Sequence, residues 1–600
     1  MSQTPEERPG GTRDCCADFS GDCSRRDFMR AGVAAAAVSG GGLGAFYFGY
    51  GASVPSPVRV GVIGTGDEGS VLLGAINPKY VEVKAIADIR PYNVYRAFHG
   101  EIGQPARPGM MKVYGWKSED EARRHVKVYG PWQEMLANAR RDGLEAIIIA
   151  LPLFLHAAVA IAAMRNGLHV LTEKLMGHTV HECKEMARVA DDTRRHLVTG
   201  HQRHYNVLYA QAADQIKRGM LGDLHFIRAQ WHRSNMPGKD SWQQPLPPGV
   251  KGKELAKRLG ELEKSRKAAG AEDFDRLDQQ VRQLKAQIAD YVLHTGGLAN
   301  GLPSLAELDG TAAGDMIQKI CELGAGKGKG KGRPAEQLGY EAMKVTNAAG
   351  DDIYDRPAIE ELIRWRLWDR TAAGLMAELG SHQLDAASIF ISAAHGGEKK
   401  IHPLSVVAAG NRPIFPPDRD CEDHVYCILE FPAPHYDPAD PQAAKKKIGV
   451  MYSSINGNGF GGYGEIVMGT KGTLILEREQ VLHEPSKAAE IRVTGGGAGP
   501  TLDTQASGAA KQMTSAGGAQ NVSRGYAEEI EHFAWCVRNP SPENIPRCHP
   551  KVALGDAVIA LVTNMAAREG RRIEFDEAWF DPAKPETPEG VEPDLTRYKA

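Results

Sequence analysis

Cysteine is scarce in this chain and is not spaced as zinc ligands usually are. Three of the nine cysteines in 600 residues, Cys15, Cys16 and Cys23, lie close to the N-terminus. The other six are Cys183, Cys321, Cys421, Cys427, Cys536 and Cys548, with no Cys-x-x-Cys pair among them. We therefore expect no metal site. Cys421 and Cys427 form the one close pair, and the sequence leaves open whether they form a disulfide or remain buried thiols.

The chain also lacks an excess of charge of either sign. Its 72 Lys and Arg residues nearly balance 75 Asp and Glu residues, so the formal net charge is -3. Such a balance offers no basic footprint for nucleic acid or for an anionic membrane. We expect no nucleic-acid partner, and the length permits two or more domains with a large core.

A targeting pattern precedes the first expected strand. The segment Ser24–Arg30 contains the pair Arg25 and Arg26 and is followed by an alanine-rich and glycine-rich apolar run from Ala31 to Ala52. This order resembles a bacterial twin-arginine (Tat) export signal. We expect residues 1–57 to be signal and linker, with the Tat machinery as partner and a periplasmic location. A disordered basic tail and an uncleaved membrane anchor are the alternatives.

The segment Val58–Gly74 indicates a nucleotide-phosphate site. Valines and isoleucine in Val58–Ile63 predict a buried parallel strand. The glycines of Gly64-Thr65-Gly66-x-x-Gly69 follow where the strand pattern changes to a helical one. Gly64 permits a tight turn, Gly66 lets the backbone approach a pyrophosphate, and Gly69 lets helix and strand pack closely. The helix N-terminus then presents free N–H groups to the phosphates.

A carboxylate at the end of the next strand predicts which dinucleotide binds. Val81–Asp88 is a second apolar strand, and Asp88 lies about 20 residues beyond the glycines, where a Rossmann fold places the acceptor for the adenosine ribose hydroxyls. Asp88 therefore favours NAD over NADP. Arg90 keeps NADP open, because a guanidinium at this position can bind a 2'-phosphate.

Strands and helices alternate through the rest of this region. Leu144–Ala150 is an apolar strand that stops before Pro152, a helix over His156–Asn166 follows, and Leu168–Thr172 is the next strand. This alternation predicts a doubly wound parallel sheet over residues 58–205. Glu173 and Lys174 come at the carboxyl end of the last of these strands, where this architecture binds its ligands.

The pattern Ala150-Leu-Pro152-x-x-x-His156, followed by Gly-Leu-His-Val-Leu-Thr-Glu173-Lys174, resembles the Gfo/Idh/MocA family of oxidoreductases. The similarity continues through Gly200-His-Gln-Arg203. This chain departs from the family pattern in having Leu175 after the Glu-Lys pair, where the family has proline. The resemblance implies a nicotinamide cofactor and a carbohydrate substrate. It also implies cofactor contacts from Pro152, His156, Glu173 and Lys174 in addition to the glycine loop with Thr65, Asp88 and Arg90.

From Gly222 onward the periodicity changes to strands without intervening helices. Leu224–Trp231, Ser405–Ala409, Asp423–Phe431, Ile448–Ile455 and a hairpin over Glu465–Leu476 predict a largely antiparallel open sheet. We expect an α+β C-terminal domain over residues 206–600, which in the family also mediates homo-oligomerisation. Helices near Tyr526–Val537 and Val552–Arg568 follow.

Residues 245–365 interrupt this second domain. Apolar residues recur at alternating spacings of three and four on both sides of Gly270, which predicts a charged helical hairpin with a narrow apolar seam. Structural decoration, a subunit contact and an active-site cover are the three roles that the sequence leaves open.

A second group of candidate catalytic residues follows the insertion. Glu378 and His382 are four apart, so on a helix they share one face. The resemblance implies that His382 is the acid/base catalyst and that Lys174 assists it, while Glu378 orients the substrate. Arg203, Trp231 and His232 are further expected substrate contacts. Asp385 is either a substrate contact or an acceptor in the core.

These residues predict an exported enzyme that moves a hydride between a tightly held NAD and a sugar, polyol or related carbohydrate. The alternatives are an NAD-dependent glycosidase that works by oxidation and elimination, and a non-catalytic sugar or dinucleotide sensor on the same fold.

Overall fold

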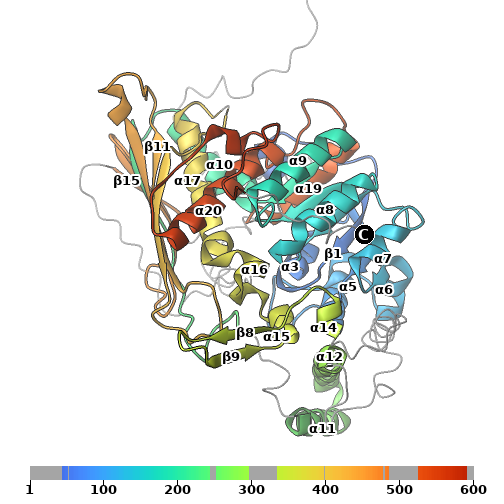
Figure 1. Ribbon diagram of the computed structural model, residues 1–600. Helices are drawn as coiled ribbons and strands as arrows, with labels where there is room; N and C mark the ends of the chain where they lie inside the picture. The colour runs from blue at the N-terminus through green and yellow to red at the C-terminus, as the bar shows by residue number, and fades with distance from the viewer. Residues whose placement is uncertain are drawn as a thin grey trace, which may run out of the picture. The chain divides into compact units, whose positions relative to one another are not determined.

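The computed structural model describes residues 43–51, 53–243, 252–295, 334–397, 399–477, 480–485 and 524–590 (Figure 1). The chain divides into two compact units, Met1–Ser53 and Val54–Ala600. The described part of the first unit contains one short helix, α2 (Leu43–Phe48). The twin-arginine segment lies outside the described residues, as do Cys15, Cys16, Cys23 and Cys321.

The second unit begins with a parallel sheet of six strands. Their order is β3-β2-β1-β4-β5-β6, and every neighbouring pair is parallel. The apolar run predicted as the first strand is buried, because Val58, Val60 and Val62 have no exposed surface. The predicted Rossmann domain is thereby confirmed. The strands are β1 (Val58–Ile63), β2 (Val81–Ala87), β3 (Lys127–Tyr129), β4 (Ala146–Ile149), β5 (His169–Glu173) and β6 (Leu197–Gly200).

Helices on both faces of this sheet begin where local sequence favours it. In α6 the Ser118 hydroxyl accepts a hydrogen bond of 3.2 Å from the Glu121 N–H. In α9 Thr179 and Glu182 form a reciprocal capping box. The helices are α3 (Asp67–Ala75), α4 (Pro91–His99), α5 (Met110–Tyr114), α6 (Glu119–His125), α7 (Trp132–Asn138), α8 (His156–Arg165) and α9 (Val180–Thr193). The next helix, α10 (Val207–Lys217), packs against α17 (Ser381–Ala394) of the second domain.

The second sheet has eight strands in the order β15-β14-β13-β7-β12-β11-β10-β16. All neighbouring pairs are antiparallel except β7 and β12, which are parallel. The predicted open, largely antiparallel sheet is therefore confirmed, including the hairpin at Thr470. The strands are β7 (Leu224–Trp231), β10 (Ser405–Asn411), β11 (His424–Pro432), β12 (Lys447–Ile455), β13 (Tyr463–Gly469), β14 (Gly472–Glu477), β15 (Gln480–Pro485) and β16 (Ile573–Glu574).

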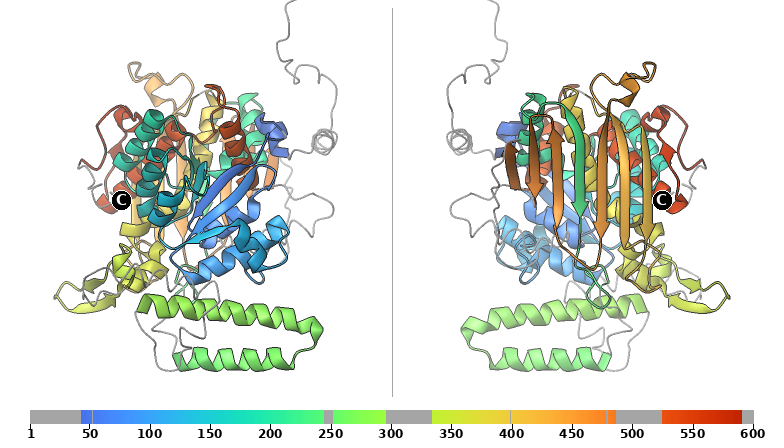
Figure 2. Two further views of the ribbon diagram at one scale, coloured as in Figure 1. Left: turned by 90° about the vertical axis from the view of Figure 1, so that its right-hand side faces the viewer. Right: turned by 90° about the vertical axis from the view of Figure 1, so that its left-hand side faces the viewer.

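Helices cover one face of this sheet, and Figure 2 (right) shows its other face turned toward the viewer. The covering helices include α17 (Ser381–Ala394) and α20 (Pro550–Glu569), while α19 (Tyr526–Arg538) packs on the parallel-sheet domain. By length and mean hydropathy alone, α20 would be able to cross a membrane. It instead packs against β10, α9 and α17, and 78% of its apolar window is buried. It is thus a core helix that joins the two sheets.

The insertion forms the predicted helical hairpin. Helices α11 (Gly252–Ala268) and α12 (Ala271–Thr295) pack through Leu259, Val281, Leu284 and Ile288. After the undescribed residues 296–333, the chain adds α14 (Pro334–Gln337), a small hairpin of β8 (Met343–Thr346) and β9 (Asp352–Arg356), α15 (Ala358–Ile363) and α16 (Asp369–Ala372). This small hairpin was not predicted, because its strands are short and only partly buried.

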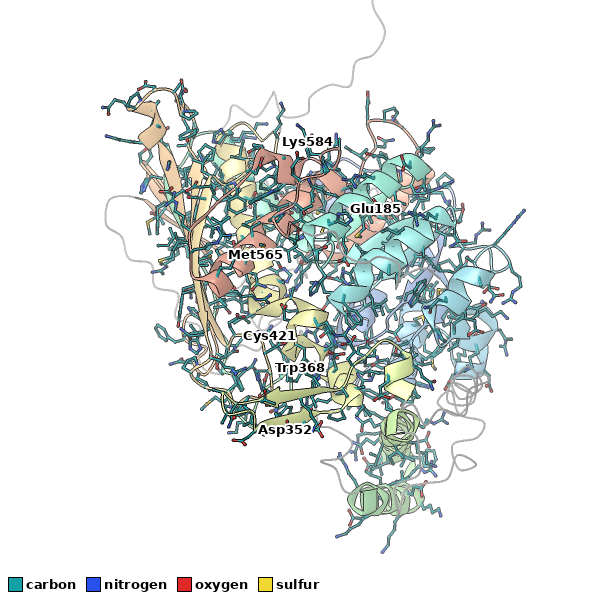
Figure 3. The ribbon with its side chains drawn as sticks, viewed as in Figure 1. Glu185, Asp352, Trp368, Cys421, Met565 and Lys584 are labelled. Atoms are coloured by element: carbon teal, nitrogen blue, oxygen red, sulfur yellow. The ribbon has the colours of Figure 1, made fainter. Side chains whose placement is uncertain are left out.

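Trp368 lies where the insertion rejoins the second domain (Figure 3). Its indole has no exposed surface, and the Arg356 guanidinium lies 4.2 Å from its ring centroid. Nearby, the Cys421 N–H donates to the Leu367 carbonyl. Cys421 and Cys427 are both free buried thiols, which settles the disulfide question left open by the sequence.

Candidate active site

One cavity of about 910 Å³ runs along the carboxyl ends of the parallel strands. This volume is typical of a cofactor or substrate site. The glycine loop and strand ends line one side, with Gly64, Gly66, Asp88, Pro152, Glu173 and Lys174 among them. The opposite side is lined by the insertion and the residues that follow it, including Trp242, Gln283, Gln287, Tyr340, Arg366 and Glu378. The cavity therefore connects the two groups of predicted site residues.

The three glycines of the loop have different structural requirements. Gly64 has a φ of +85°, and a Cβ added there would lie 2.2 Å from the Ala150 carbonyl oxygen. A Cβ at Gly69 would lie 2.0 Å from the Gly64 carbonyl oxygen. A Cβ at Gly66 would meet only the Asn93 amide nitrogen, at 3.7 Å. Gly64 and Gly69 are thus required by the turn and its packing, whereas Gly66 leaves the backbone open toward the cavity.

Asp88 is held by the glycine loop at the end of β2. One carboxylate oxygen accepts hydrogen bonds from the Thr65 N–H, at 2.7 Å, and from its hydroxyl, while the other accepts from the Arg90 N–H at 2.8 Å. Asn93 donates to both oxygens. Burial raises the pKa of Asp88, although these donors and the Arg90 charge oppose that rise. The carboxylate is fixed in the cavity wall, where it meets the adenosine ribose in a Rossmann fold.

His156 joins two of the loops that border the cavity. Its Nδ1 lies 2.8 Å from the Leu175 carbonyl oxygen, and its Nε2 lies 2.9 Å from that of Leu151. The ring is 1% exposed, and burial lowers its pKa. The structure thus places His156 behind the loop surface, where it positions Pro152 and Lys174, and the peptide bond between Lys174 and Leu175 is cis.

Glu173 presents a buried carboxyl group at the end of β5. One oxygen accepts a hydrogen bond from the Lys174 N–H, and the other, Oε1, has no hydrogen-bond partner among the described residues. Burial raises the pKa of Glu173 well above its ordinary value, and the charge of Glu68 raises it further. The protonated form that this favours can donate a hydrogen bond to a bound polar group.

Lys174 and Glu378 connect the two halves of the site. The Lys174 ammonium donates a 2.6 Å hydrogen bond to the backbone carbonyl of Glu378. Glu378 lies in a π-helical turn, Met376–Gly380, that runs directly into α17, and such turns are frequent at functional sites. The Glu378 carboxylate accepts a hydrogen bond of 3.1 Å from Arg366. Burial would raise the pKa of Glu378, but the charges of Lys174 and Arg366 outweigh it and lower that pKa.

His382 follows in the first turn of α17. Its side chain is 6% exposed, and its ring centroid lies 5.2 Å from that of Trp231. Burial lowers the pKa of His382 well below its ordinary value, and the charges of Lys174 and Arg203 lower it further. A neutral imidazole is the form that accepts a proton. Since the Lys174 charge contributes to the lowered pKa of His382, the two side chains interact electrostatically.

The predicted substrate residues lie deeper than the cavity wall. Trp231 stacks on Tyr463 with ring centroids 5.0 Å apart. Arg203 is 4% exposed, and its guanidinium lies 3.5 Å from Glu465 on the second sheet. His232 continues the end of β7, and its N–H donates to Gly462. Within the described residues, none of these side chains lines the cavity, and neither does His382. Trp231 contacts the His382 ring, and the Arg203 charge acts on it.

Asp385 belongs to a separate buried cluster. It accepts a 2.9 Å hydrogen bond from His204, and Lys400 lies 3.6 Å away and also pairs with Asp556. Donor atoms of His201, Asp385 and Asp556 all lie within 4.8 Å of one another. Because the Lys400 ammonium already neutralises these carboxylates, the cluster suits a core acceptor better than a cation site. The second of the two roles left open for Asp385 is the one that this geometry favours.

Several residues of the site escaped the sequence analysis. Arg366, Gln283 and Gln287 line the cavity, but they lie in or after the insertion, and no motif marks them. Arg90 was expected at the cofactor, and it does line the cavity, yet its guanidinium is paired with Asp290 of α12. The Arg90–Asp290 pair joins segments 200 positions apart in the chain, so no local sequence pattern indicates it.

The residues present fit a dinucleotide. Gly66 leaves room for a pyrophosphate, Asp88 provides a ribose acceptor, and Glu173 and Lys174 line the same cavity. Residues 58–201 match a family model, GFO_IDH_MocA, described as "Oxidoreductase family, NAD-binding Rossmann fold". The predicted NAD-binding Rossmann fold is confirmed over these residues, which are similar to the family that the sequence resembles.

Curated relatives are similar to part of this chain. A "Glycosyl hydrolase family 109 protein" of Solibacter usitatus is 25% identical over 208 residues, which cover 34% of this chain and 44% of that protein. An "Alpha-N-acetylgalactosaminidase" of Bacteroides fragilis is 26% identical over 177 residues, which cover 29% of this chain and 37% of the relative. The chain thus matches less than half the length of these relatives.

Among solved structures, an inositol dehydrogenase homologue complexed with NAD+ from Azotobacter vinelandii is 14% identical, with a TM-score of 0.49. That similarity covers 87% of this chain and 98% of the homologue. The WlbA dehydrogenase from Bordetella pertussis, in complex with NADH and UDP-GlcNAcA, is 12% identical with a TM-score of 0.47. This similarity covers 87% of this chain and 99% of the WlbA dehydrogenase.

Proposed function

With residues 58–201 assigned to the NAD-binding domain of the Gfo/Idh/MocA oxidoreductases, we propose that this chain oxidises or reduces a carbohydrate at a CH–OH carbon. A sugar, a polyol or a sugar derivative is the substrate class. The observation that carries the proposal is the bond from Lys174 to the Glu378 carbonyl, at the end of a cavity that begins at the glycine loop.

The chain's own residues divide the chemistry between them. Bound NAD+ would supply the hydride acceptor at C4 of its nicotinamide ring. The neutral His382 imidazole takes the proton of the substrate hydroxyl, and the Lys174 ammonium stabilises the negative charge that develops on the oxygen. Glu378 and Arg366 form an ion pair that holds this end of the cavity and orients substrate hydroxyls. In the opposite direction, His382 returns the proton to the alkoxide oxygen.

We further propose that the protein is exported by the Tat pathway with its cofactor in place. The twin-arginine segment supports export, and a Tat substrate crosses the membrane folded. Because free NAD is scarce outside the cytoplasm, the cofactor has to be retained and regenerated within the catalytic cycle. Either a second carbonyl substrate or an oxidised intermediate of the same reaction would take the hydride back and restore NAD+.

An NAD-dependent glycosidase is the second candidate function. The relatives named as glycosyl hydrolase family 109 proteins favour it, since one of them is 25% identical to this chain over 208 residues. In that reaction, oxidation at one sugar carbon acidifies the neighbouring C–H bond, so that loss of its proton expels the aglycone. Water then adds, and the ketone is reduced back, so the cycle has no net redox change. His382 and Lys174 would serve this route with the same groups.

The test is a panel of sugars, polyols and chromogenic glycosides, N-acetyl-α-galactosaminides included, given to the purified full-length protein. A dehydrogenase accumulates reduced nicotinamide, whereas a glycosidase releases aglycone without net reduction. A protein that holds NAD but does neither would instead be a sensor. A protein that binds no dinucleotide would contradict the proposal altogether.

A further inference from the structure

The helical insertion supplies one wall at the adenosine end of the cavity. Helix α12 packs along α4, the helix that starts directly after Asp88 and Arg90. Gln283 and Gln287 of α12 line the cavity, and the Gln283 amide donates a 3.2 Å hydrogen bond to the Tyr92 hydroxyl. The Tyr95 hydroxyl donates to the Gln279 carbonyl. These contacts fix the insertion to the dinucleotide domain.

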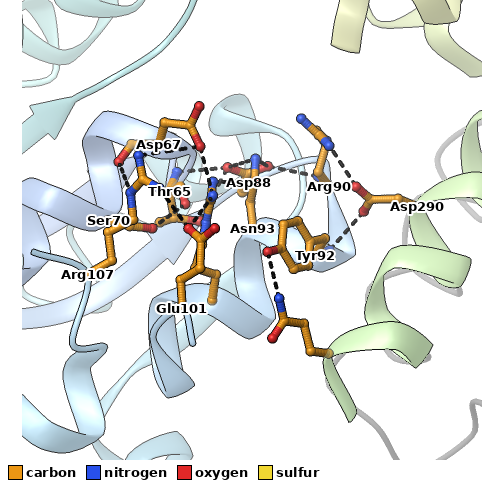
Figure 4. A network of polar contacts seen from close by, with 12 residues as sticks. Thr65, Asp67, Ser70, Asp88, Arg90, Tyr92, Asn93, Glu101, Arg107 and Asp290 are labelled. Atoms are coloured by element: carbon orange, nitrogen blue, oxygen red, sulfur yellow. Dashed lines mark hydrogen bonds and ion pairs between the residues drawn. The ribbon is translucent and has the colours of Figure 1, made fainter. Parts of the chain in front are cut away.

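Asp290 is the charged member of this contact (Figure 4). One of its oxygens accepts a 3.0 Å hydrogen bond from Arg90 Nε, and the other accepts a 2.8 Å bond from the Tyr92 N–H. Its side chain is only 8% exposed. The carboxylate is therefore a built part of the cavity's surroundings, held at both oxygens, and not a mobile surface group.

This arrangement bears on the choice between NAD and NADP. The two cofactors differ by a 2'-phosphate on the adenosine ribose, which enzymes bind with a basic side chain near the end of the second strand. Arg90 occupies that position, but Asp290 already neutralises its guanidinium. A 2'-phosphate at Arg90 would also lie near two carboxylates, Asp88 in the cavity wall and Asp290 on the guanidinium, in a setting where like charges repel.

We propose that Asp290, carried by the insertion, is a specificity-determining residue that excludes NADP by occupying Arg90. This inference rests on the proposed binding of NAD. It gives the insertion a role as a wall of the cofactor site, which, of the three roles left open by the sequence, is nearest to the active-site cover. The recognition of the ribose is thereby shared between the Rossmann domain and a segment about two hundred residues away.

The test is Asp290→Asn, which keeps an acceptor for the Tyr92 N–H while removing the charge that holds Arg90. We expect the affinity for NADP+ relative to NAD+ to rise by about tenfold or more. The readouts are direct binding titration of cofactor-depleted protein and the identity of the nucleotide that the purified protein releases on denaturation. Neither readout depends on activity.

Two further variants make the result specific. Asp278→Asn removes a carboxylate of the same helix that pairs with Arg266 and Arg282 of the hairpin, and it should leave the cofactor preference unchanged. Adding Arg90→Gln to Asp290→Asn should abolish the gain in NADP+ binding. Arg90→Gln alone, with Asp290 intact, should change the affinity for NADP+ by less than about threefold, because Asp290 already occupies the guanidinium in the wild type.

The inference is overturned if Asp290→Asn keeps the wild-type preference, or if the wild type binds NADP+ as tightly as NAD+. It is also overturned if Arg90→Gln alone strongly weakens NADP+ binding, which would show that the guanidinium is available; this variant remains informative should Asp290→Asn fail to fold. Failure of the proposed function looks different, since the wild type would then bind neither dinucleotide.

Discussion

The Lys174 ammonium lies 2.6 Å from the backbone carbonyl oxygen of Glu378, so a strand end of the parallel sheet contacts the helix that carries His382. This contact spans the boundary between the two predicted domains and directs a positive charge toward the proposed base. It ties the redox proposal to a specific geometry, because either side chain alone would be an ordinary buried polar residue.

Removing either side chain should remove most of the chemistry. We expect Lys174→Met and His382→Gln each to lower kcat by about 10²- to 10⁴-fold, which is the usual contribution of a positioned acid or base. The bound NAD should remain, as measured by nucleotide release on denaturation. His402→Gln, which removes an imidazole paired with Glu577 near the surface, should retain wild-type kcat. Full activity in His382→Gln would exclude it as the base.

The pH profile should report the environment of His382. Burial and the charges of Lys174 and Arg203 lower its pKa, while Asp385 opposes them. Because the neutral imidazole is the active form of a base, activity should stay constant as pH falls from 8 toward the ordinary histidine value of about 6.5 and decline only below it. Lys174→Met removes one of the lowering charges, so the acid limb of its residual activity should move to higher pH. An acid limb that stays in place would contradict the electrostatic coupling.

The glycine loop offers a test that separates folding from cofactor binding. Gly66→Ala should leave the free energy of unfolding within about 0.5 kcal/mol of the wild type, because the added Cβ meets nothing closer than 3.7 Å. It should nevertheless lower the NAD content, since the methyl group enters the space for the pyrophosphate. Gly64→Ala should destabilise the fold by roughly 1–3 kcal/mol or more, because of its positive φ and the 2.2 Å approach to Ala150. Thermal unfolding measures the stability of each variant, and nucleotide release on denaturation measures its NAD content.

The outer face of the second sheet remains the predicted site of homo-oligomerisation. Val407, Ile428 and Met451 are directly opposite one another on β10, β11 and β12 and are 46%, 55% and 37% exposed. Val407→Arg with Ile428→Arg should lower the native mass measured by light scattering without loss of bound NAD. Met220→Ser, which removes an exposed apolar side chain beyond α10, is the matched control. An unchanged oligomer in the double variant would place the interface elsewhere.

Export can be tested independently of the site. We expect Arg25→Lys with Arg26→Lys to retain the protein in the cytoplasm, because the export machinery recognises the arginine pair. Cell fractionation with immunodetection measures this. Equal amounts in the periplasm for the variant and the wild type would count against Tat export.

The elements of the fold were largely predictable because their signals are local. The valines of β1, the three glycines and the Ser118 and Thr179 caps each specify structure within a few residues. Contacts between distant segments were not predictable. The pairing of Arg90 with Asp290 and the position of Arg366 depend on how the insertion packs, and hydrophobic spacing specifies the hairpin but not its partner.

Among the predicted site residues, too, those at strand ends were easier to place than those whose partners lie far away in the sequence. Lys174, Glu173, Asp88 and Glu378 line one cavity, as expected from strand ends and a helix that meet at the carboxyl edge of the sheet. Arg203 was expected near the substrate, and Asp385 was left open between a substrate contact and an acceptor in the core. In the structure their side chains pair with Glu465 and His204, because a buried charge requires a partner and the fold supplies one.

The most direct measurement is a single-turnover experiment on purified protein that carries NAD, mixed with the carbohydrate panel and followed at the absorbance of reduced nicotinamide. The account predicts that at least one carbohydrate reduces the bound cofactor in the wild type, and that His382→Gln with the same NAD content does not respond. A wild-type protein that holds NAD but is reduced by no carbohydrate, or that holds no dinucleotide, would contradict it.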